Sequence, residues 1–189
     1  PGLPVGKFAA VPGVRTAAGA FFDIDIQGKG GHGAFPHLAI DPIPIAAQLI
    51  GALQTLVSRA TSPNDSVVLS ITKVHAGDAY NVIPDAARLS GTVRCFSMQK
   101  MRELEVQTRE LAESVAAGYG ASATLDFRVP FHPVVNDDEA TRFAGDICAS
   151  IAGEDNVFRS GAPGTGSEDF SFMTEQVPGC YLIIGNGED

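Results

Sequence analysis

The sequence predicts an α+β fold in which residues 20–133 form a ferredoxin-like domain with the element order β-α-β-β-α-β. Two observations support this prediction. Four stretches show the period-two alternation or the β-branched enrichment of strands, and two longer stretches between them carry apolar residues at helical spacing. In such a fold, two helices cover one face of a four-stranded antiparallel sheet.

The first strand and helix are predicted by a change of period. Phe22, Ile24 and Ile26 alternate with polar residues, as in a half-buried strand. Asp41 and Pro42 then suit the N-cap and the first turn of a helix. The apolar face of this helix consists of Ile45, Leu49, Leu53 and Leu56.

The second half of the domain repeats this order. Residues 67–74 and 87–96 are rich in β-branched side chains, and the polar connection 77–85 between them is too long for a tight hairpin. Ser97 caps a second helix that ends at Gly118 and Gly120. The expected apolar line of that helix is Met101, Leu104, Leu111 and Val115, and the fourth strand carries Ala123, Leu125, Phe127 and Val129.

Period two assigns the two faces of the sheet. Leu89, Val93 and Cys95 are expected to point toward the helices. The open, polar face is expected to carry Arg88, Ser90, Thr92, Arg94, Asp23, Asp25, Asp126 and Arg128.

The flanking segments 1–19 and 134–189 contain too few elements for a layered α/β domain. A helix is predicted at 140–152, and the apolar run 180–184 is typical of a central strand covered on both faces. We therefore interpret both ends as pieces of a second domain, interrupted by residues 20–133. Without its neighbours, the 180–184 strand is expected to be frayed, rearranged or buried against another copy.

The composition limits the class of partner. Net charge is −9 and the isoelectric point is near 4.8, which disfavours nucleic acid and anionic membranes, and RNA binding on the open sheet face in particular. No apolar run is long enough to span a bilayer. Three scattered cysteines argue against a disulfide framework or a zinc knuckle and favour a cytoplasmic location.

The stretch 28–42 combines glycines with two histidines. Glycines around His32 allow a tight bend and leave its imidazole unshielded, which suits polarisation of a carbonyl or proton transfer. A flexible strand-to-helix loop with incidental histidines is an equally good interpretation of the pattern alone.

Seven segments in order resemble the metal-dependent amidohydrolases of the aminoacylase, carboxypeptidase G and hippurate hydrolase type. The similarity is greatest to hippurate and indole-acetyl-amino-acid hydrolases. The segments are 1–6 (PGLPVG), 28–37 (GKGGHGAFPH), 81–84 (NVIP), 91–94 (GTVR), 135–137 (VND), 166–170 (GSEDF) and 185–188 (GNGE).

The resemblance implies an α/β catalytic domain interrupted by a ferredoxin-like lid that also forms a homodimer. Two divalent ions, zinc or manganese, activate water against N-acyl amino acids such as hippurate-like amides. His32 then stabilises the oxyanion in the partner subunit's active site, and Asn81 and Arg94 bind the substrate's carbonyl or carboxylate. Gly166 and Ser167 are expected to line the substrate pocket.

Simpler roles exist for the same residues. Asn81 is also a plausible turn residue, and Arg94 could pair with Asp23 or Asp126 on the open face. Glu168 and Asp169 receive no catalytic role, because adjacent carboxylates commonly begin helices. His37 is expected to buttress the first helix, and His75 and His132 to be structural or exposed.

The sequence also departs from the family pattern. The family's metal-ligating histidines would precede Pro1 and follow Asp189, and none of the four histidines matches a ligand. We expect no metal site in this chain and no hydrolysis by it alone. The alternative interpretation is a stand-alone ferredoxin-like ligand-binding or dimerisation module without catalysis.

Overall fold

A computed structural model describes residues 2–187, and the chain divides into two compact units. The central unit comprises residues 20–130. The flanking unit combines the segment up to Gly19 with the segment from Phe131 onward.

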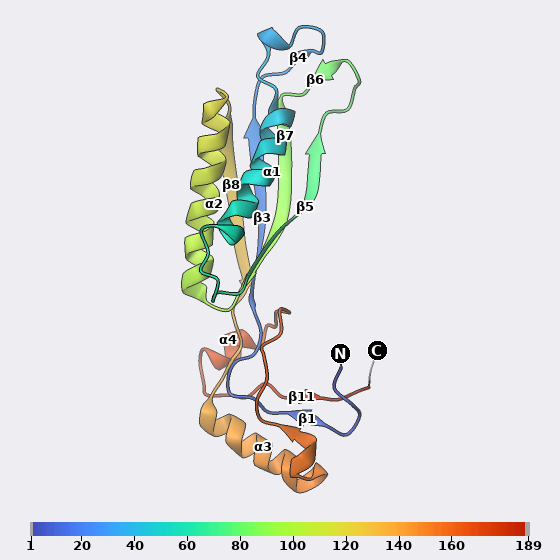
Figure 1. Cartoon of the computed structure of the whole chain (residues 1–189), viewed down its shortest axis with the longest axis vertical. Helices are drawn as coiled ribbons and strands as arrows, with labels where there is room; N and C mark the ends of the chain where they lie inside the picture. Colours follow the sequence, from blue (N-terminus) through green and yellow to red (C-terminus); the bar gives the residue numbers. More distant parts are fainter. Residues whose placement is uncertain (1, 188–189) are drawn as a thin grey trace. The chain divides into compact units, whose positions relative to one another are not determined.

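The central unit contains a four-stranded antiparallel sheet with the order β5-β7-β3-β8. The strands are β3 (Ala18–Gln27), β5 (Val67–Ala76), β7 (Ala86–Cys95) and β8 (Ser122–Phe131). Helices α1 (Pro42–Ser58) and α2 (Met98–Gly118) pack against each other and cover one face (Figure 1). This arrangement confirms the predicted β-α-β-β-α-β order.

Both helices begin at the predicted caps. The Asp41 carboxylate accepts a hydrogen bond from the backbone N–H of Ile43 at 2.9 Å, and the Ser97 hydroxyl accepts one from Lys100 at 3.4 Å. Satisfied N-termini fix where each helix starts, and thus which side chains face the sheet. The fully buried side chains between the helices and the sheet include Phe22, Ile24, Ile26, Ile45, Leu49, Leu53, Leu89, Val93, Met101 and Leu104.

One prediction about α2 is wrong in its C-terminal half. Leu111 and Val115 are only half-buried, and the buried side chains of this half of the helix belong to other positions. Steps of four residues keep these buried positions over the sheet, and small side chains there let the helix approach closely. The buried residues of α2 are Met101, Leu104, Thr108, Ala112 and Ala116.

The opposite face of the sheet is polar, as predicted. Arg88 forms two bonds with the Asp25 carboxylate, at 2.6 and 2.9 Å. Arg128 pairs with Asp23 at 2.5 Å and with Asp126 at 2.7 Å. The Arg88–Asp25 and Arg128–Asp23 pairs cross between strands, whereas Arg128 and Asp126 both lie on β8, so the open face carries a network of ion pairs.

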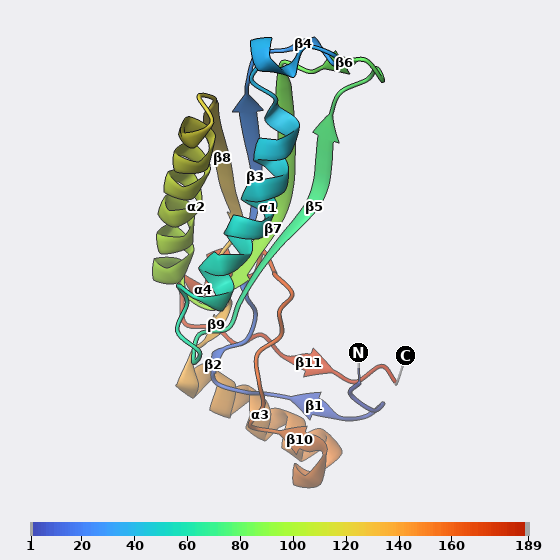
Figure 2. The same cartoon turned by 45° about the horizontal axis from the view of Figure 1, so that its top comes forward.

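The flanking unit has only short strands. β1 (Phe8–Ala9) lies between β10 (Val157–Phe158) and β11 (Ile183–Ile184), and β2 (Gly13–Val14) pairs with β9 (Val135–Asn136). Helix α3 (Asp138–Ala152) begins two residues earlier than predicted, at an Asp137 cap. Among the described residues, this unit also contains a 3-10 turn, η2 (Glu154–Asn156), and the short α4 (Ser171–Thr174), which is labelled in Figure 2.

The buried Asn136 side chain joins three segments of the flanking unit. Its amide donates to the carbonyls of Val11 and Tyr181, at 2.9 and 3.1 Å, and its carbonyl accepts from the Tyr181 N–H at 2.7 Å. All polar atoms of this buried amide therefore have partners. Asn136 belongs to the VND segment of the sequence.

The predicted central strand at 180–184 is largely absent. Only Ile183–Ile184 is a strand, it lies at one edge of its sheet, and the two side chains are 44% and 65% exposed. An apolar run identifies a strand that is suited to burial, but burial requires neighbours on both faces. The strand is shortened, as expected for a run without those neighbours.

Truncating a core leucine should destabilise the central unit. Leu49→Ala removes a fully buried side chain of α1, so the free energy of unfolding should fall by about 2–5 kcal/mol. Chemical denaturation measures this change. The matched control, Leu38→Ala at a 64% exposed position, should change it by less than about 0.5 kcal/mol. Equal effects would contradict the packing described here.

The open-face network should make stability depend on pH. A hydrogen bond from Ser90, and then the Arg128 guanidinium, hold the pKa of Asp23 below its usual range. Because this pKa is lower in the folded chain, the stabilisation is present above the unfolded-state pKa and is lost as pH falls through the folded-state pKa. Denaturation of the wild type and Asp23→Asn should therefore differ most near neutral pH and converge in acid. A difference that does not shrink in acid would contradict the pair.

Candidate functional site

A small two-stranded ribbon at one end of the central unit brings His32 and Asn81 together. β4 (Gly31–His32) and β6 (Val82–Ile83) pair antiparallel, with His32 opposite Val82. The N–H of Gly33 also donates to the carbonyl of Asn81 at 2.7 Å. The ribbon lies beyond the end of the four-stranded sheet (Figures 1 and 2), and we call it the tip.

Two glycines make this close pairing possible. A Cβ atom at Gly30 would lie 2.7 Å from the carbonyl oxygen of Ile83, and one at Gly33 would lie 3.2 Å from that of Asn81. The Asp85 carboxylate accepts a hydrogen bond from the N–H of Gly30 at 2.8 Å and anchors the ribbon to the start of β7. This ribbon was not predicted from the sequence, although its glycines are the signal of a close approach between two segments.

His32 is exposed, and its hydrogen bonding fixes which nitrogen carries the proton. Its Nδ1 accepts a hydrogen bond from the backbone N–H of Ala34 at 3.1 Å. A lone pair is therefore needed on Nδ1, and the neutral ring carries its proton on Nε2. The exposed imidazole thus offers an Nε2–H donor. Its ring centroid lies 5.5 Å from that of Phe35.

Arg94 lies at the other end of the same unit. It is near the end of β7, eight residues after Ala86, which corresponds to about 26 Å at roughly 3.3 Å per residue. Its guanidinium carbon lies 5.8 Å from the centroid of the Phe21 ring. Asp23 and Asp126, the pairing partners considered from sequence, are both bound by Arg128. The structure therefore does not place Arg94 beside His32 in one chain.

Gly166 and Ser167 belong to the flanking unit. The N–H of Ala17 donates to the carbonyls of Gly164 and Gly166, at 3.1 and 2.9 Å, which anchors the glycine-rich loop before Ser167. Further along that segment, burial, and then a hydrogen bond to Glu168, raise the pKa of the Tyr181 phenol. Glu168 is thus engaged as an acceptor of a structural hydrogen bond.

Of the remaining histidines, His37 shares the neighbouring Phe35 ring with His32, whereas His75 and His132 lie elsewhere. His37 falls in the 3-10 turn η1 (Pro36–Leu38), and its ring centroid is 6.3 Å from that of Phe35. His75 is exposed on β5 opposite Arg88. His132 contacts the Glu175 carboxylate through Nδ1 at 2.5 Å and packs against the Phe172 ring.

The described residues do not form a metal site. Within residues 2–187, no group of three or more His, Cys, Asp and Glu side chains could hold a metal ion. The metal ions implied by the family resemblance therefore do not fit the residues described. In the same range, no helix has the length and apolar character needed to cross a membrane.

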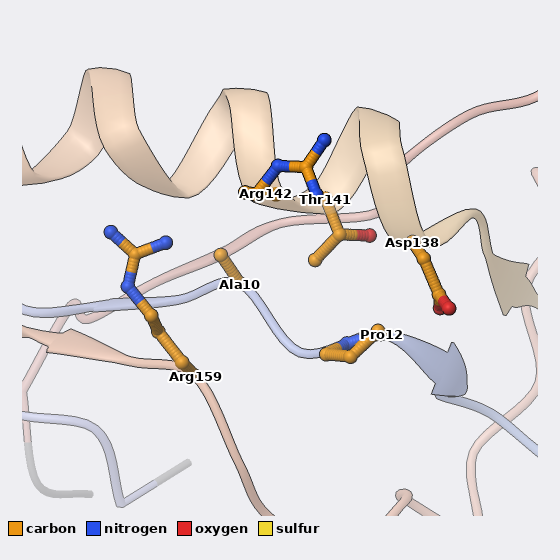
Figure 3. Close-up of a pocket in the computed structure, with 6 residues that line it drawn as sticks. All are labelled: Ala10, Pro12, Asp138, Thr141, Arg142 and Arg159. Carbon is orange, nitrogen blue, oxygen red and sulfur yellow. The ribbon is translucent and has the colours of Figure 1, made fainter.

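The flanking unit also contains a cavity of about 170 Å³ beside α3, drawn in Figure 3. Arg159 at this cavity is bound by Glu154 at 2.7 Å and by Asp146 at 2.9 Å, and it holds the pKa of Glu154 below its usual range. None of the sequence-predicted site residues lines this cavity. The lining residues are Ala10, Pro12, Asp138, Thr141, Arg142 and Arg159.

Loosening the Asp85 anchor should expose the tip to hydrogen exchange. Asp85→Ala removes the acceptor for the Gly30 N–H, so the β4–β6 pairing should open more often. The amide of Gly33, bonded to Asn81, should then exchange at least about tenfold faster by NMR. Asp78→Ala, in the same connection between strands, is the control. Unchanged Gly33 exchange in Asp85→Ala would reject the anchoring role.

Comparison with known proteins supports the resemblance noted from sequence. The chain is 40% identical over 190 residues to N-acetylcysteine deacetylase from Bacillus subtilis, covering 100% of this chain and 49% of that protein. It is 36% identical over 187 residues to the IAA-amino acid hydrolase ILR1-like 2 from Arabidopsis thaliana, covering 97% of this chain and 42% of that protein. The chain therefore spans about half the length of these relatives.

A solved structure shares both units. A Bacillus subtilis dinuclear metal binding peptidase from the M20 family matches with a TM-score of 0.80 and 33% identity, over 100% of this chain and 47% of that protein. The peptidase dimerisation domain matches residues 15–120, which include both the tip and Arg94. The chain thus belongs to the M20 peptidase dimerisation domain family.

Proposed function

We propose that the whole protein is a metal-dependent amidohydrolase that cleaves N-acyl amino acids, and that this chain supplies its lid and part of its substrate site. Support comes from the relatives, which are named as an N-acetylcysteine deacetylase and an IAA-amino acid hydrolase. Two divalent ions, zinc or manganese, would activate the attacking water. Since residues 2–187 contain no group of ligands for them, those ions would be held by residues outside this range.

In this proposal His32 stabilises negative charge on the substrate. Its proton lies on Nε2 because Nδ1 accepts a hydrogen bond from the Ala34 N–H, and the side chain is exposed. A donor held in this way gains strength as the amide oxygen becomes an oxyanion, which is where catalysis benefits most. The exposed side-chain amide of Asn81, fixed at the adjacent position of the ribbon, offers a second donor to the same substrate.

Arg94 binds the carboxylate of the amino-acid half of the substrate. A guanidinium presents two parallel N–H donors, which match a carboxylate. Gly166 and Ser167, in the anchored loop of the flanking unit, would line the pocket that holds the remainder of the substrate.

The similarity to these amidohydrolases carries the proposal, and the separation of His32 from Arg94 within one chain determines how many copies of the chain the proposed site requires. The strand from Ala86, at the tip end of β7, to Arg94 is about 26 Å long at roughly 3.3 Å per residue, far more than the few bonds that join an amide to its carboxylate. Both residues serve one small substrate only if they come from two copies. We therefore infer a homodimer in which the tip of one subunit reaches the site that contains Arg94 of its partner.

Loss of either residue should impair the reaction in a different way. In the whole protein, His32→Ala should lower kcat about 10²–10³-fold with little change in KM, because a transition-state donor is lost. Arg94→Ala should mainly raise KM for substrates with a free carboxylate. Steady-state kinetics on N-acyl amino acids measures both.

Mixing these two variants tests the shared site directly. A heterodimer of His32→Ala and Arg94→Ala subunits has one site in which both residues are intact, if the site is built from two chains. Random mixing should then restore about a quarter of the wild-type activity. If both residues acted within one chain, every site would keep one defect and the mixture would stay inactive.

A further inference from the structure

The tip carries exposed apolar side chains that the proposed roles of His32 and Asn81 leave unexplained. Phe35 is 53% exposed, Leu38 64% and Val82 53%. These residues are not in loose segments, because the N–H of Phe35 donates to the carbonyl of His32 at 2.8 Å and the N–H of Leu38 to that of Phe35 at 3.1 Å. A partner or ligand that covers these side chains removes apolar surface from water, which favours its binding.

Two of these side chains lie directly beside the imidazole. The Phe35 ring centroid is 5.5 Å from that of His32, with the ring planes tilted by 50°. Val82 is the cross-strand partner of His32 in the β4–β6 ribbon, and side chains at directly opposed positions share a face. His32, Phe35 and Val82 thus lie together on the tip, so a group that accepts a hydrogen bond from the imidazole comes close to the two apolar side chains.

The covalent structure of the substrate identifies which of its groups would lie beside Phe35 and Val82. In an N-acyl amino acid, the acyl substituent is bonded directly to the carbonyl carbon whose oxygen would meet the Nε2–H. The amino-acid side chain is attached beyond the amide nitrogen, and the carboxylate is drawn toward Arg94. The acyl group is consequently the part of the substrate nearest to the two apolar side chains.

We propose that Phe35 and Val82 form an acyl-recognition surface that favours an aromatic acyl group over acetyl. This inference rests on the proposed function and specifies the substrate class of the same site. An aromatic acyl ring gains edge or offset contact with the Phe35 ring and covers the Val82 side chain. An acetyl group is too small to do both.

The experiment compares two substrates with the same amino-acid half, N-benzoylglycine and N-acetylglycine, in the whole protein. Because contacts to the carboxylate are common to both, the ratio of their kcat/KM values reports the acyl group alone. Phe35→Ala and Val82→Ala should each lower the benzoyl-to-acetyl ratio, by at least about tenfold for Phe35→Ala. Phe35→Leu, which keeps apolar bulk, should give an intermediate ratio.

Val74→Ala is the matched control for Val82→Ala, since Val74 is 59% exposed on β5 of the same unit. Its ratio should equal that of the wild type. Denaturation midpoints of all variants establish that they are folded, and the ratio is independent of the active fraction.

The outcomes separate this inference from the proposed function. Equal losses for both substrates in Phe35→Ala and Val82→Ala would overturn the acyl-recognition surface, since the side chains would then contact the partner subunit. Failure of the wild type to cleave either amide, or full activity of His32→Ala, would overturn the proposed function and this inference with it. A selective fall in the ratio, with kcat of His32→Ala lowered about 10²–10³-fold on both amides, supports both.

Discussion

The length and stiffness of β7 set the geometry on which the candidate site depends. The strand is hydrogen-bonded to β5 along nearly its whole length. Arg94 lies near its C-terminal end, and the tip lies beyond its N-terminal end. Side-chain rotamer changes at His32 or Arg94 cannot close a separation that is set by a paired strand of ten residues. Within one chain, the imidazole donor and the guanidinium therefore belong to different places. If they act on the same amide, dimerisation is a requirement of catalysis and not an addition to it.

The tip obtains its precision from backbone interactions. Gly30 and Gly33 have no Cβ atom, so their backbone can lie close to the carbonyl oxygens of Ile83 and Asn81. The Asp85 carboxylate joins the ribbon to the start of β7 through its hydrogen bond with the Gly30 N–H. His32 is then oriented by the Ala34 N–H, without help from a buried side chain. Such a group keeps a fixed direction while it remains exposed, which suits a residue that must enter the site of another subunit.

Much of the central unit could be predicted because its elements are long enough to show a period. Asp41 and Ser97 marked the helix starts for a local reason, the unsatisfied N–H groups of a first turn. The two-residue strands β4 and β6 have no period, so their pairing, and with it the approach of Asn81 to His32, could not be read from the sequence. The buried line of α2 passes through Thr108 instead of Leu111, because packing against a close sheet overrides hydropathy. Whether residues 180–184 form a full strand depends on neighbouring strands and helices, which an apolar run in the sequence does not reveal.

The tautomer of His32 also limits what the residue can do in the proposed chemistry. A general base at this position would need a free lone pair facing the substrate, but the lone pair of Nδ1 is taken by Ala34 and the exposed Nε2 bears the proton. The ring can donate to an oxygen that gains charge, and in its neutral form it cannot also accept a proton from the attacking water. Asn81 and Arg94 are likewise donors. The residues proposed for this chain thus stabilise negative charge, and the group that deprotonates water must be a different one.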